Sequence, residues 1–144
     1  MIEIRPAGPA DAPALAALSV QLGYPVTADA MGRRLAAILD TPHDLVLVSC
    51  GDRDRPVGWI HVGERRLLEA DDYCEILGLV VDGAHRRQGR AGRLVAAAER
   101  WARERGHPQI TVRSNIVRAE SHPFYERAGY TRVKTQHVYR KALK

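Results

Sequence analysis

The fold expected of this chain is decided by one stretch, Leu79-Val80-Val81-Asp82-Gly83-Ala84-His85-Arg86-Arg87-Gln88-Gly89-Arg90-Ala91-Gly92-Arg93-Leu94-Val95. It reads as a buried strand that runs through a short basic turn, rich in glycine, directly into a helix. The first N–H groups of a helix lack partners and carry partial positive charge, and small residues there let an anion approach the backbone closely. The stretch therefore predicts a phosphate-binding turn.

Around this stretch, length and composition indicate one ordinary globular domain spanning residues 1–144. Hydrophobic residues make up 45% and charged residues 27% of the chain, without low-complexity runs or repeats. A net charge of +5 favours anionic partners such as phosphorylated cofactors or nucleic acid. Cys50 and Cys74 lie in apolar runs without metal-ligand spacing, so we expect free, buried thiols.

No targeting signal is expected at the N-terminus, because Met1–Pro6 lacks a basic region followed by an apolar one. No apolar run approaches the ~18 residues that would span a bilayer. These features predict a cytoplasmic protein without a membrane partner.

Hydrophobic periodicity and turn residues give the remaining elements. The expected helices begin at Asp11, at Thr27, after the basic turn, and at Glu120 or Ser121. The expected strands are Ile2–Arg5, Leu45–Val48, Val57–Val62, Tyr73–Val81, Gln109–Ser114 and Tyr130–Tyr139. The order β-α-α-β-β-β-α-β-α-β predicts an α/β fold, a mixed central sheet with helices on both faces.

Other functions and an ordinary structural role also have to be considered for the basic turn. It lacks the Gly-x-Gly-x-x-Gly of a dinucleotide fold and the Gly-Lys-Ser/Thr of a Walker A loop. A DNA-binding helix would explain the cluster Arg86, Arg87, Arg90 and Arg93 but not the glycines, and no turn-plus-recognition-helix pair is evident. The residues alone also allow ordinary turn glycines with solvated arginines.

Three segments together resemble one known family. The turn fits the pattern Arg/Gln-x-x-Gly-x-Gly/Ala through Arg86, Gly89 and Ala91, and the strand Glu75–Val81 precedes it. Further on, Ser114-Asn115 and then His122-Pro123-Phe124-Tyr125-Glu126-Arg127-Ala128-Gly129-Tyr130 are similar to an Asn…Phe-Tyr-x-x-x-Gly-Phe/Tyr segment. In these segments the chain resembles the GNAT N-acetyltransferase superfamily.

That resemblance implies a GNAT fold in which the fourth and fifth strands splay apart and hold acetyl-CoA, the cosubstrate, between them. It places the pyrophosphate on the N–H groups of Arg87 to Gly92 and pairs pantetheine with the backbone near Val80 and Val81. The cofactor-binding residues that it implies are Leu79, Val80, Val81, Arg86, Arg87, Gln88, Gly89, Arg90, Ala91, Gly92, Asn115 and Tyr125.

Acetyl transfer to an amine needs a base, because an ammonium group with a pKa near ~10.4 is protonated at neutral pH. Glu75 is the candidate, since burial would raise the pKa of a carboxyl group in an apolar run; facing solvent or pairing with an arginine is the alternative. By resemblance, Tyr125 is the acid that protonates the leaving thiolate, whereas its neighbour Phe124 suits packing. The N–H of Val80 or Val81 is the implied oxyanion donor.

Other polar residues are weaker candidates. His122 could relay protons and His61 could face the acceptor, although a cap or surface role suits both, and Tyr24, Glu64 and Tyr73 could border the acceptor pocket. The six histidines lack metal-ligand spacing, so no metal is expected.

The function expected is acetyl transfer from acetyl-CoA to a primary amine, by direct attack in a ternary complex. The late segment resembles members that modify small molecules such as aminoglycosides, so a small-molecule amine is the expected acceptor. The alternatives are acetylation of a protein N-terminus or lysine, a non-catalytic acyl-CoA-binding module, and a nucleic-acid-binding module. A homodimer through the last strands stays open.

Overall fold

The computed structural model describes residues 3–114 and 121–144, which form two compact units. The first unit runs up to Val112 and the second begins at Arg113. Each is described by itself below. The prediction of a single domain over residues 1–144 stays a prediction.

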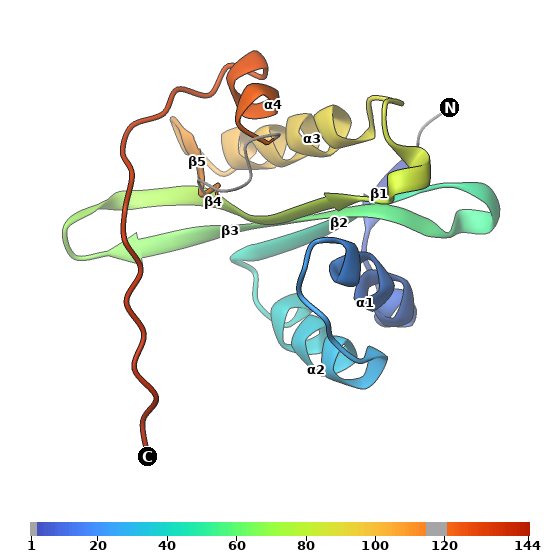
Figure 1. The fold of residues 1–144 in the computed structure, drawn as a ribbon. Helices are drawn as coiled ribbons and strands as arrows, with labels where there is room; N and C mark the ends of the chain where they lie inside the picture. The colour runs from blue at the N-terminus through green and yellow to red at the C-terminus, as the bar shows by residue number, and fades with distance from the viewer. Residues whose placement is uncertain (1–2, 115–120) are drawn as a thin grey trace. The chain divides into compact units, whose positions relative to one another are not determined.

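The first unit is built on one five-stranded sheet in the order β1-β2-β3-β4-β5 (Figure 1). Neighbouring strands are antiparallel except β4 and β5, which are parallel. The strands are β1 Glu3–Pro6, β2 Asp44–Cys50, β3 Pro56–Leu67, β4 Ala70–Val81 and β5 Ile110–Val112. The parallel pair requires a crossover, which the helix α3, Arg90–Glu104, supplies.

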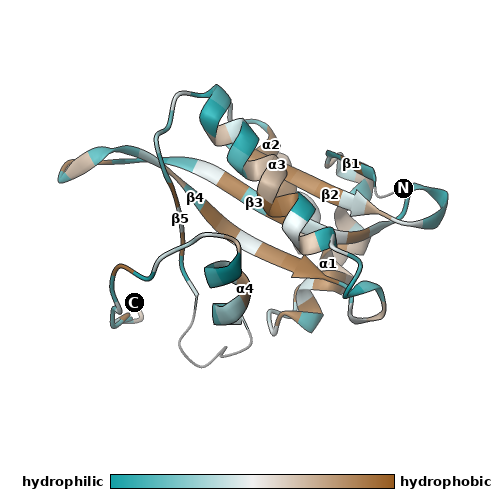
Figure 2. Cartoon of the chain, turned by 90° about the horizontal axis from the view of Figure 1, so that it is seen from above, coloured by the Kyte–Doolittle hydropathy of each residue, from teal (hydrophilic) through white to brown (hydrophobic). Residues whose placement is uncertain are grey.

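Helices cover both faces of this sheet, as predicted. In Figure 1, α1 (Ala12–Gln21) and α2 (Ala28–Leu39) lie against one face and α3 against the other. Figure 2 shows apolar stretches in the strands beneath α3, and hydrophilic stretches that alternate with apolar ones along the visible side of that helix. The buried residues of α3 are Leu94, Val95, Ala98 and Ala102, which recur at helical spacing.

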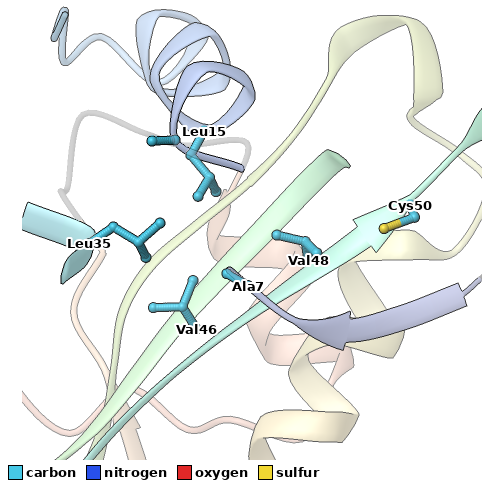
Figure 3. Close-up of a cluster of buried hydrophobic side chains, with 7 residues drawn as sticks. Ala7, Leu15, Leu35, Val46, Val48 and Cys50 are labelled. Atoms are coloured by element: carbon cyan, nitrogen blue, oxygen red, sulfur yellow. The ribbon is translucent and has the colours of Figure 1, made fainter. Parts of the chain in front are cut away.

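The core on the opposite face joins both short helices to β2. Leu15 of α1 and Leu35 of α2 pack with Val46 and Val48, all at most 5% exposed (Figure 3). Burying a side chain of this size contributes about 1.5–3 kcal/mol. This packing defines the α1–α2 face of the sheet, on which part of the candidate site lies.

The two predicted helix starts have different outcomes. Thr27 caps α2 as expected, because its hydroxyl accepts a hydrogen bond from the N–H of Ala30 at 3.1 Å. Asp11 is the N-cap residue of α1, as predicted, but its side chain makes no capping hydrogen bond. Its carboxylate instead accepts hydrogen bonds from the Arg5 guanidinium at 2.8 and 2.9 Å and from the Gly8 N–H. Arg5 is a stronger partner than a helix N–H, and it lowers the pKa of Asp11.

The second unit contains α4, Ser121–Arg127, followed by an extended segment. The strand predicted at Tyr130–Tyr139 is not formed, since these described residues pair with no other described strand. Alternation of side chains makes a strand only where a neighbouring strand completes the hydrogen bonds. The rest of the predicted order holds, and the α/β class with a mixed sheet is confirmed.

Within the described residues, no helix is long and apolar enough to cross a membrane.

Candidate active site

The sheet opens along β4. β5 pairs only with Cys74, Glu75 and Ile76 of β4, whereas β3 pairs with β4 along most of its length. From Leu77 to Val81, the β4 edge on the β5 side has no strand partner among the described residues. The predicted splay of the fourth and fifth strands is therefore confirmed.

A β-bulge marks the point where this opening begins. His61 pairs with Gly78 and the next β3 residue, Val62, pairs with Ile76, so Leu77 is an extra residue in β4. Gly78 lies under Trp59, and a Cβ at this position would come within 2.7 Å of the indole ring. Gly78 thus leaves room for the Trp59 ring beside the bulge. β-Bulges re-aim side chains and end pairing.

The alternation of the ladder decides which β4 N–H groups face the opening. The Asp82 N–H donates to the Val57 carbonyl at 2.8 Å, and the pairing between Gly78 and Val81 is regular. Because residues two apart along a strand point their backbone groups to the same side, Val80 is directed to β3. Leu79 and Val81 are directed away from β3. Of the two N–H groups considered for the oxyanion, the ladder favours Val81.

The turn after β4 presents its backbone to solvent, as a phosphate site requires. Arg87 and Gly89 have φ of 64° and 78°, so the chain turns twice through the left-handed region before α3. For a residue with a side chain this costs of order 1–3 kcal/mol, and such backbone strain gathers at functional sites. Gly89 is the N-cap and no side chain caps the helix.

The first intrahelical hydrogen bond of α3 runs from the Arg93 N–H to the Gly89 carbonyl at 3.1 Å. The N–H groups of Arg90, Ala91 and Gly92 therefore have no acceptor within the helix. A Cβ at Gly92 would meet no described atom within 4 Å, so packing does not explain the glycine. Glycine costs a helix about 0.5–1 kcal/mol relative to alanine. A glycine at this position leaves room for a ligand at the helix start.

Side chains from other elements hold this turn in place. Gln21 of α1 donates to Asp82 at 2.7 Å and accepts from the Gly83 N–H at 2.9 Å. His85 contacts the other Asp82 oxygen at 2.9 Å. The hydrogen bond from Gln21, followed by that from His85, lowers the pKa of Asp82. The turn is thus organised by the protein itself.

Two arginines of the motif have structural partners that sequence reasoning missed. Arg90 donates to the Ser49 hydroxyl at 2.9 Å and to the Cys50 carbonyl at 3.1 Å, tying the start of α3 to the end of β2. Arg86 donates to the Val81 carbonyl at 3.3 Å. The only sequence signal was Ser49, a polar residue inside an apolar strand. Arg87 and Gln88 lie exposed in the turn, and Gln88 accepts from Arg90 at 2.7 Å.

Glu75 is buried, with 7% exposure, on the sheet face that α1 and α2 cover. The Tyr73 hydroxyl lies 3.5 Å from its carboxylate. Register places Glu75 beside Gly63, and Gly63 beside Asp44, so two carboxylates share one row across three strands. This burial excludes the solvent-facing orientation that was considered for Glu75.

His61 lies on the same face, opposite Val46. Its Nε2 is 3.0 Å from a carboxylate oxygen of Asp44, and both side chains are less than a fifth exposed. The structure therefore brings together Tyr73, Glu75, His61 and Asp44 on the face beside the opening. Asp44 was not singled out by the sequence, where it reads as an ordinary strand-end residue.

Glu64 lies on the α3 face of the sheet, so it is no longer a candidate for bordering the acceptor pocket. It accepts from Arg105 at 2.6 Å and contacts His107 at 2.5 Å and His43 at 3.0 Å. These partners, the Arg105 hydrogen bond first, lower the pKa of Glu64 to about 2. Tyr24, the remaining acceptor candidate, is 61% exposed in the turn after α1.

Both cysteines are free and buried, as predicted. Burial raises the pKa of each thiol to about 11, so Cys50 and Cys74 are inert at neutral pH.

The remaining predicted residues belong to the second unit or lie outside the described residues. Tyr125 sits in α4, where its ring makes edge contacts with Phe124 at 5.1 Å and Tyr130 at 5.9 Å between centroids. Burial raises the pKa of Tyr125. His122 is half-buried in the first turn of the same helix. Asn115 lies outside the described residues.

The open strand edge and the uncapped helix start together define a site for an extended ligand that carries phosphates. Comparison with known proteins agrees. A model of the acetyltransferase (GNAT) family matches residues 14–130, and the chain belongs to this family. It is an N-acetyltransferase, and acetyl-CoA is its acyl donor.

Solved structures share the fold over nearly the whole chain. The aminoglycoside antibiotic 6'-N-acetyltransferase AAC(6')-Ih from Acinetobacter baumannii is 18% identical, with 100% of both chains covered and a TM-score of 0.86. AAC(6')-Iy in complex with the bisubstrate analogue CoA-S-monomethyl-acetylneamine is 20% identical, with 99% of both chains covered and a TM-score of 0.85. A putative acetyltransferase from Agrobacterium tumefaciens is 26% identical, covering 96% of this chain and 99% of its own, with a TM-score of 0.84. No curated protein sequence matches the chain significantly.

Proposed function

We propose that this acetyltransferase modifies a primary amine of a small, cationic molecule by direct transfer within a ternary complex. The observation that carries the proposal is the buried Glu75 carboxylate, held on β4 immediately before the bulge that opens the strand edge. A carboxylate there can take the proton that keeps an ammonium group from attacking.

The donor site supports this function. The uncapped N–H groups at Arg90, Ala91 and Gly92 suit the pyrophosphate, and the glycine without a packing role leaves it room. The open backbone at Leu79, next to Val81, suits a pantetheine amide. When bound, acetyl-CoA supplies an activated thioester. The Val81 N–H then stabilises negative charge on the reacting carbonyl oxygen, and Tyr125 protonates the thiolate that leaves.

The acidic row supports a cationic acceptor. Asp44 of β2 and Glu75 of β4 lie on one sheet face. His61 lies on the same face of β3, the strand between them. Carboxylates in a partly buried setting attract ammonium groups more strongly than exposed ones, because water screens them less. The structures of aminoglycoside acetyltransferases with this fold are consistent with such an acceptor.

A thiol-release assay over a matched acceptor panel tests the proposal. The panel contains aminoglycosides, simple polyamines, a lysine-containing peptide and a peptide with a free N-terminus, each with saturating acetyl-CoA. We expect the highest kcat/KM for a polyamine or aminoglycoside. Higher values for a peptide would show the protein-modifying alternative, and acetyl-CoA binding by calorimetry without any transfer would show a non-catalytic module. Absence of acetyl-CoA binding would contradict the donor site itself.

A further inference from the structure

Ser49 is a polar residue near the end of an apolar strand, and its side chain is fully buried. It is 0% exposed, and its neighbours in β2 are apolar and buried as well. Val48 and Cys50 belong to the core beneath α1 and α2, so the alternation of a strand turns Ser49 to the α3 face. A buried hydroxyl costs stability unless it has a hydrogen-bond partner, whereas an apolar side chain would pack there without this cost. Packing alone therefore does not explain the serine.

The partner of this hydroxyl is Arg90, the first residue of α3. Its Nη1 donates to the Ser49 Oγ at 2.9 Å and to the Cys50 carbonyl at 3.1 Å, and its Nε donates to the Gln88 side-chain oxygen at 2.7 Å. These contacts hold the guanidinium through two of its three nitrogens. Nη2 donates to no described residue, so its two N–H donors stay available.

The charge of Arg90 is not neutralised by the protein. All three acceptors are neutral oxygens, and Arg90 forms no ion pair with the described residues. A cation in the first turn of a helix is unfavourable, because the helix start itself carries partial positive charge. An anion bound there would gain from both charges. Arg90 is thus placed where it costs stability in the free protein and serves a phosphate in the complex.

The hydrogen bond from Arg90 to Ser49 links elements that lie two strands apart in the sheet. Ser49 pairs with Gly58 of β3, and Gly58 pairs with Val81 of β4, the strand that leads into the basic turn. Gly58 puts no side chain into this row, and a Cβ there would come within 3.1 Å of the Val80 carbonyl oxygen and 3.2 Å of the Val81 side chain. The row stays open, and Arg90 connects the turn with the end of β2.

We propose that Ser49 is a positioning residue for the acyl donor, because its hydroxyl holds the Arg90 guanidinium ready for a phosphate oxygen of acetyl-CoA. A guanidinium that is already held loses less freedom on binding than a mobile one, so this preorganisation strengthens the phosphate contact. Ser49 acts only through Arg90, since it is fully buried. The affinity for the donor is thereby set in part from β2. This inference rests on the proposed placement of the pyrophosphate at the α3 start, and it holds for any acceptor amine.

Calorimetry with acetyl-CoA tests the role of the hydroxyl. Ser49→Ala should raise the Kd about 10-fold, the loss expected for one hydrogen bond to a charged group. Ser19→Ala is the matched control, because Ser19 is also buried but its hydroxyl donates to the Leu15 carbonyl within α1 at 3.0 Å. This control should keep the wild-type Kd. Ser49→Thr and Ser49→Val have the same shape, so the Thr variant should bind acetyl-CoA more tightly than the Val variant even if both lower the melting temperature.

A double-mutant cycle tests whether Ser49 acts through Arg90. Arg90→Ala should itself weaken acetyl-CoA binding, and Ser49→Ala should add no further loss in that background. The salt dependence of the Kd gives a second readout. The wild-type Kd should rise more steeply with NaCl than the Kd of Ser49→Ala, because salt screens the contact between guanidinium and phosphate. A serine with a merely structural role would leave this slope unchanged.

Three results would overturn the inference while leaving the donor site in place. They are wild-type affinity in Ser49→Ala, equal losses of affinity with and without Arg90, and equal affinities of the Thr and Val variants at position 49. Wild-type protein that binds no acetyl-CoA would contradict the proposed donor site itself, and this inference with it.

Discussion

The two ends of α3 treat their backbone and charges in opposite ways. At the first end, α3 starts from Gly89 without a side-chain cap and leaves N–H groups facing solvent. At the last end, Gly106 terminates the helix with φ of 86°, and Arg105 and His107 converge on Glu64. One end is satisfied by the protein's own groups and the other is left for a ligand. The last end of α3 thus contributes to stability, and the first end is available for binding.

The largest effect should come from the strand that leads into the open end. Glu75→Gln keeps the size of a buried side chain but removes the base, so kcat should fall by about 10²–10⁴-fold. The KM for acetyl-CoA should change little, because Glu75 lies before the bulge. Steady-state kinetics over pH 6–9 measures both. Asp44→Asn is the matched control on the same face, and an equal loss of kcat there would assign the effect to charge rather than to proton transfer.

At the open end itself, Gly92→Val should raise the KM for acetyl-CoA by about 10-fold, because the new side chain occupies the space of the ligand. The melting temperature should hold or rise, since a Cβ there meets no described atom. Gly32→Ala, in α2, is the matched control and should leave KM unchanged. If both variants behaved alike, Gly92 would be an ordinary helix glycine.

Tyr125 should show a smaller effect on turnover. Tyr125→Phe removes the hydroxyl, so kcat should fall by about 10-fold, which is less than the ~10²–10⁴-fold that a general acid or base typically contributes. Because burial raises its pKa, the hydroxyl stays protonated through neutral and mildly alkaline pH. Wild-type kcat should therefore show no decline from this group across neutral and mildly alkaline pH. Phe124→Leu is the packing control, and unchanged kcat in Tyr125→Phe would reject the acid role.

The smallest effect on activity should come from the closed end. Glu64→Gln should leave kcat and KM within about 2-fold but lower the free energy of unfolding by about 1–2 kcal/mol at pH 7, after allowance for solvent screening. The folded-state pKa of Glu64, about 2, lies below the ordinary 4.5, so its stabilisation is fully present above pH 4.5 and is lost as pH falls toward 2. Urea unfolding from pH 7 to pH 2 measures this. A variant as acid-sensitive as wild type would contradict the role of Glu64.

Local sequence patterns predicted those parts of the molecule whose partners are near in sequence. Glycines gave the turn before α3, and Thr27 gave a cap, because both act through backbone a few residues away. The Arg90 contact with Ser49 could not be predicted, since it joins residues 41 positions apart. Glu64 was misassigned for the same reason, because its partners His43, just before β2, and Arg105, just after α3, are distant in the sequence.

The predicted last strand failed for a different physical reason. Alternation in Tyr130–Tyr139 describes a strand's side chains but not the edge that would pair with it. The register in which strands pair likewise cannot be predicted from the sequence. The row that brings Asp44 and Glu75 onto one face depends on the pairing of three strands, and on the extra residue Leu77.

The sizes of the side chains at positions 59 and 78 are coupled. The indole ring fills the space that any side chain at Gly78 would need, and a Cβ 2.7 Å from the ring would force the ring or the strand to shift. Because the bulge at Leu77 adjoins this contact, enlarging residue 78 would move the strand edge and not only a side chain. Substitutions at this contact should therefore vary the two residues jointly, with a smaller residue at 59 whenever 78 is enlarged.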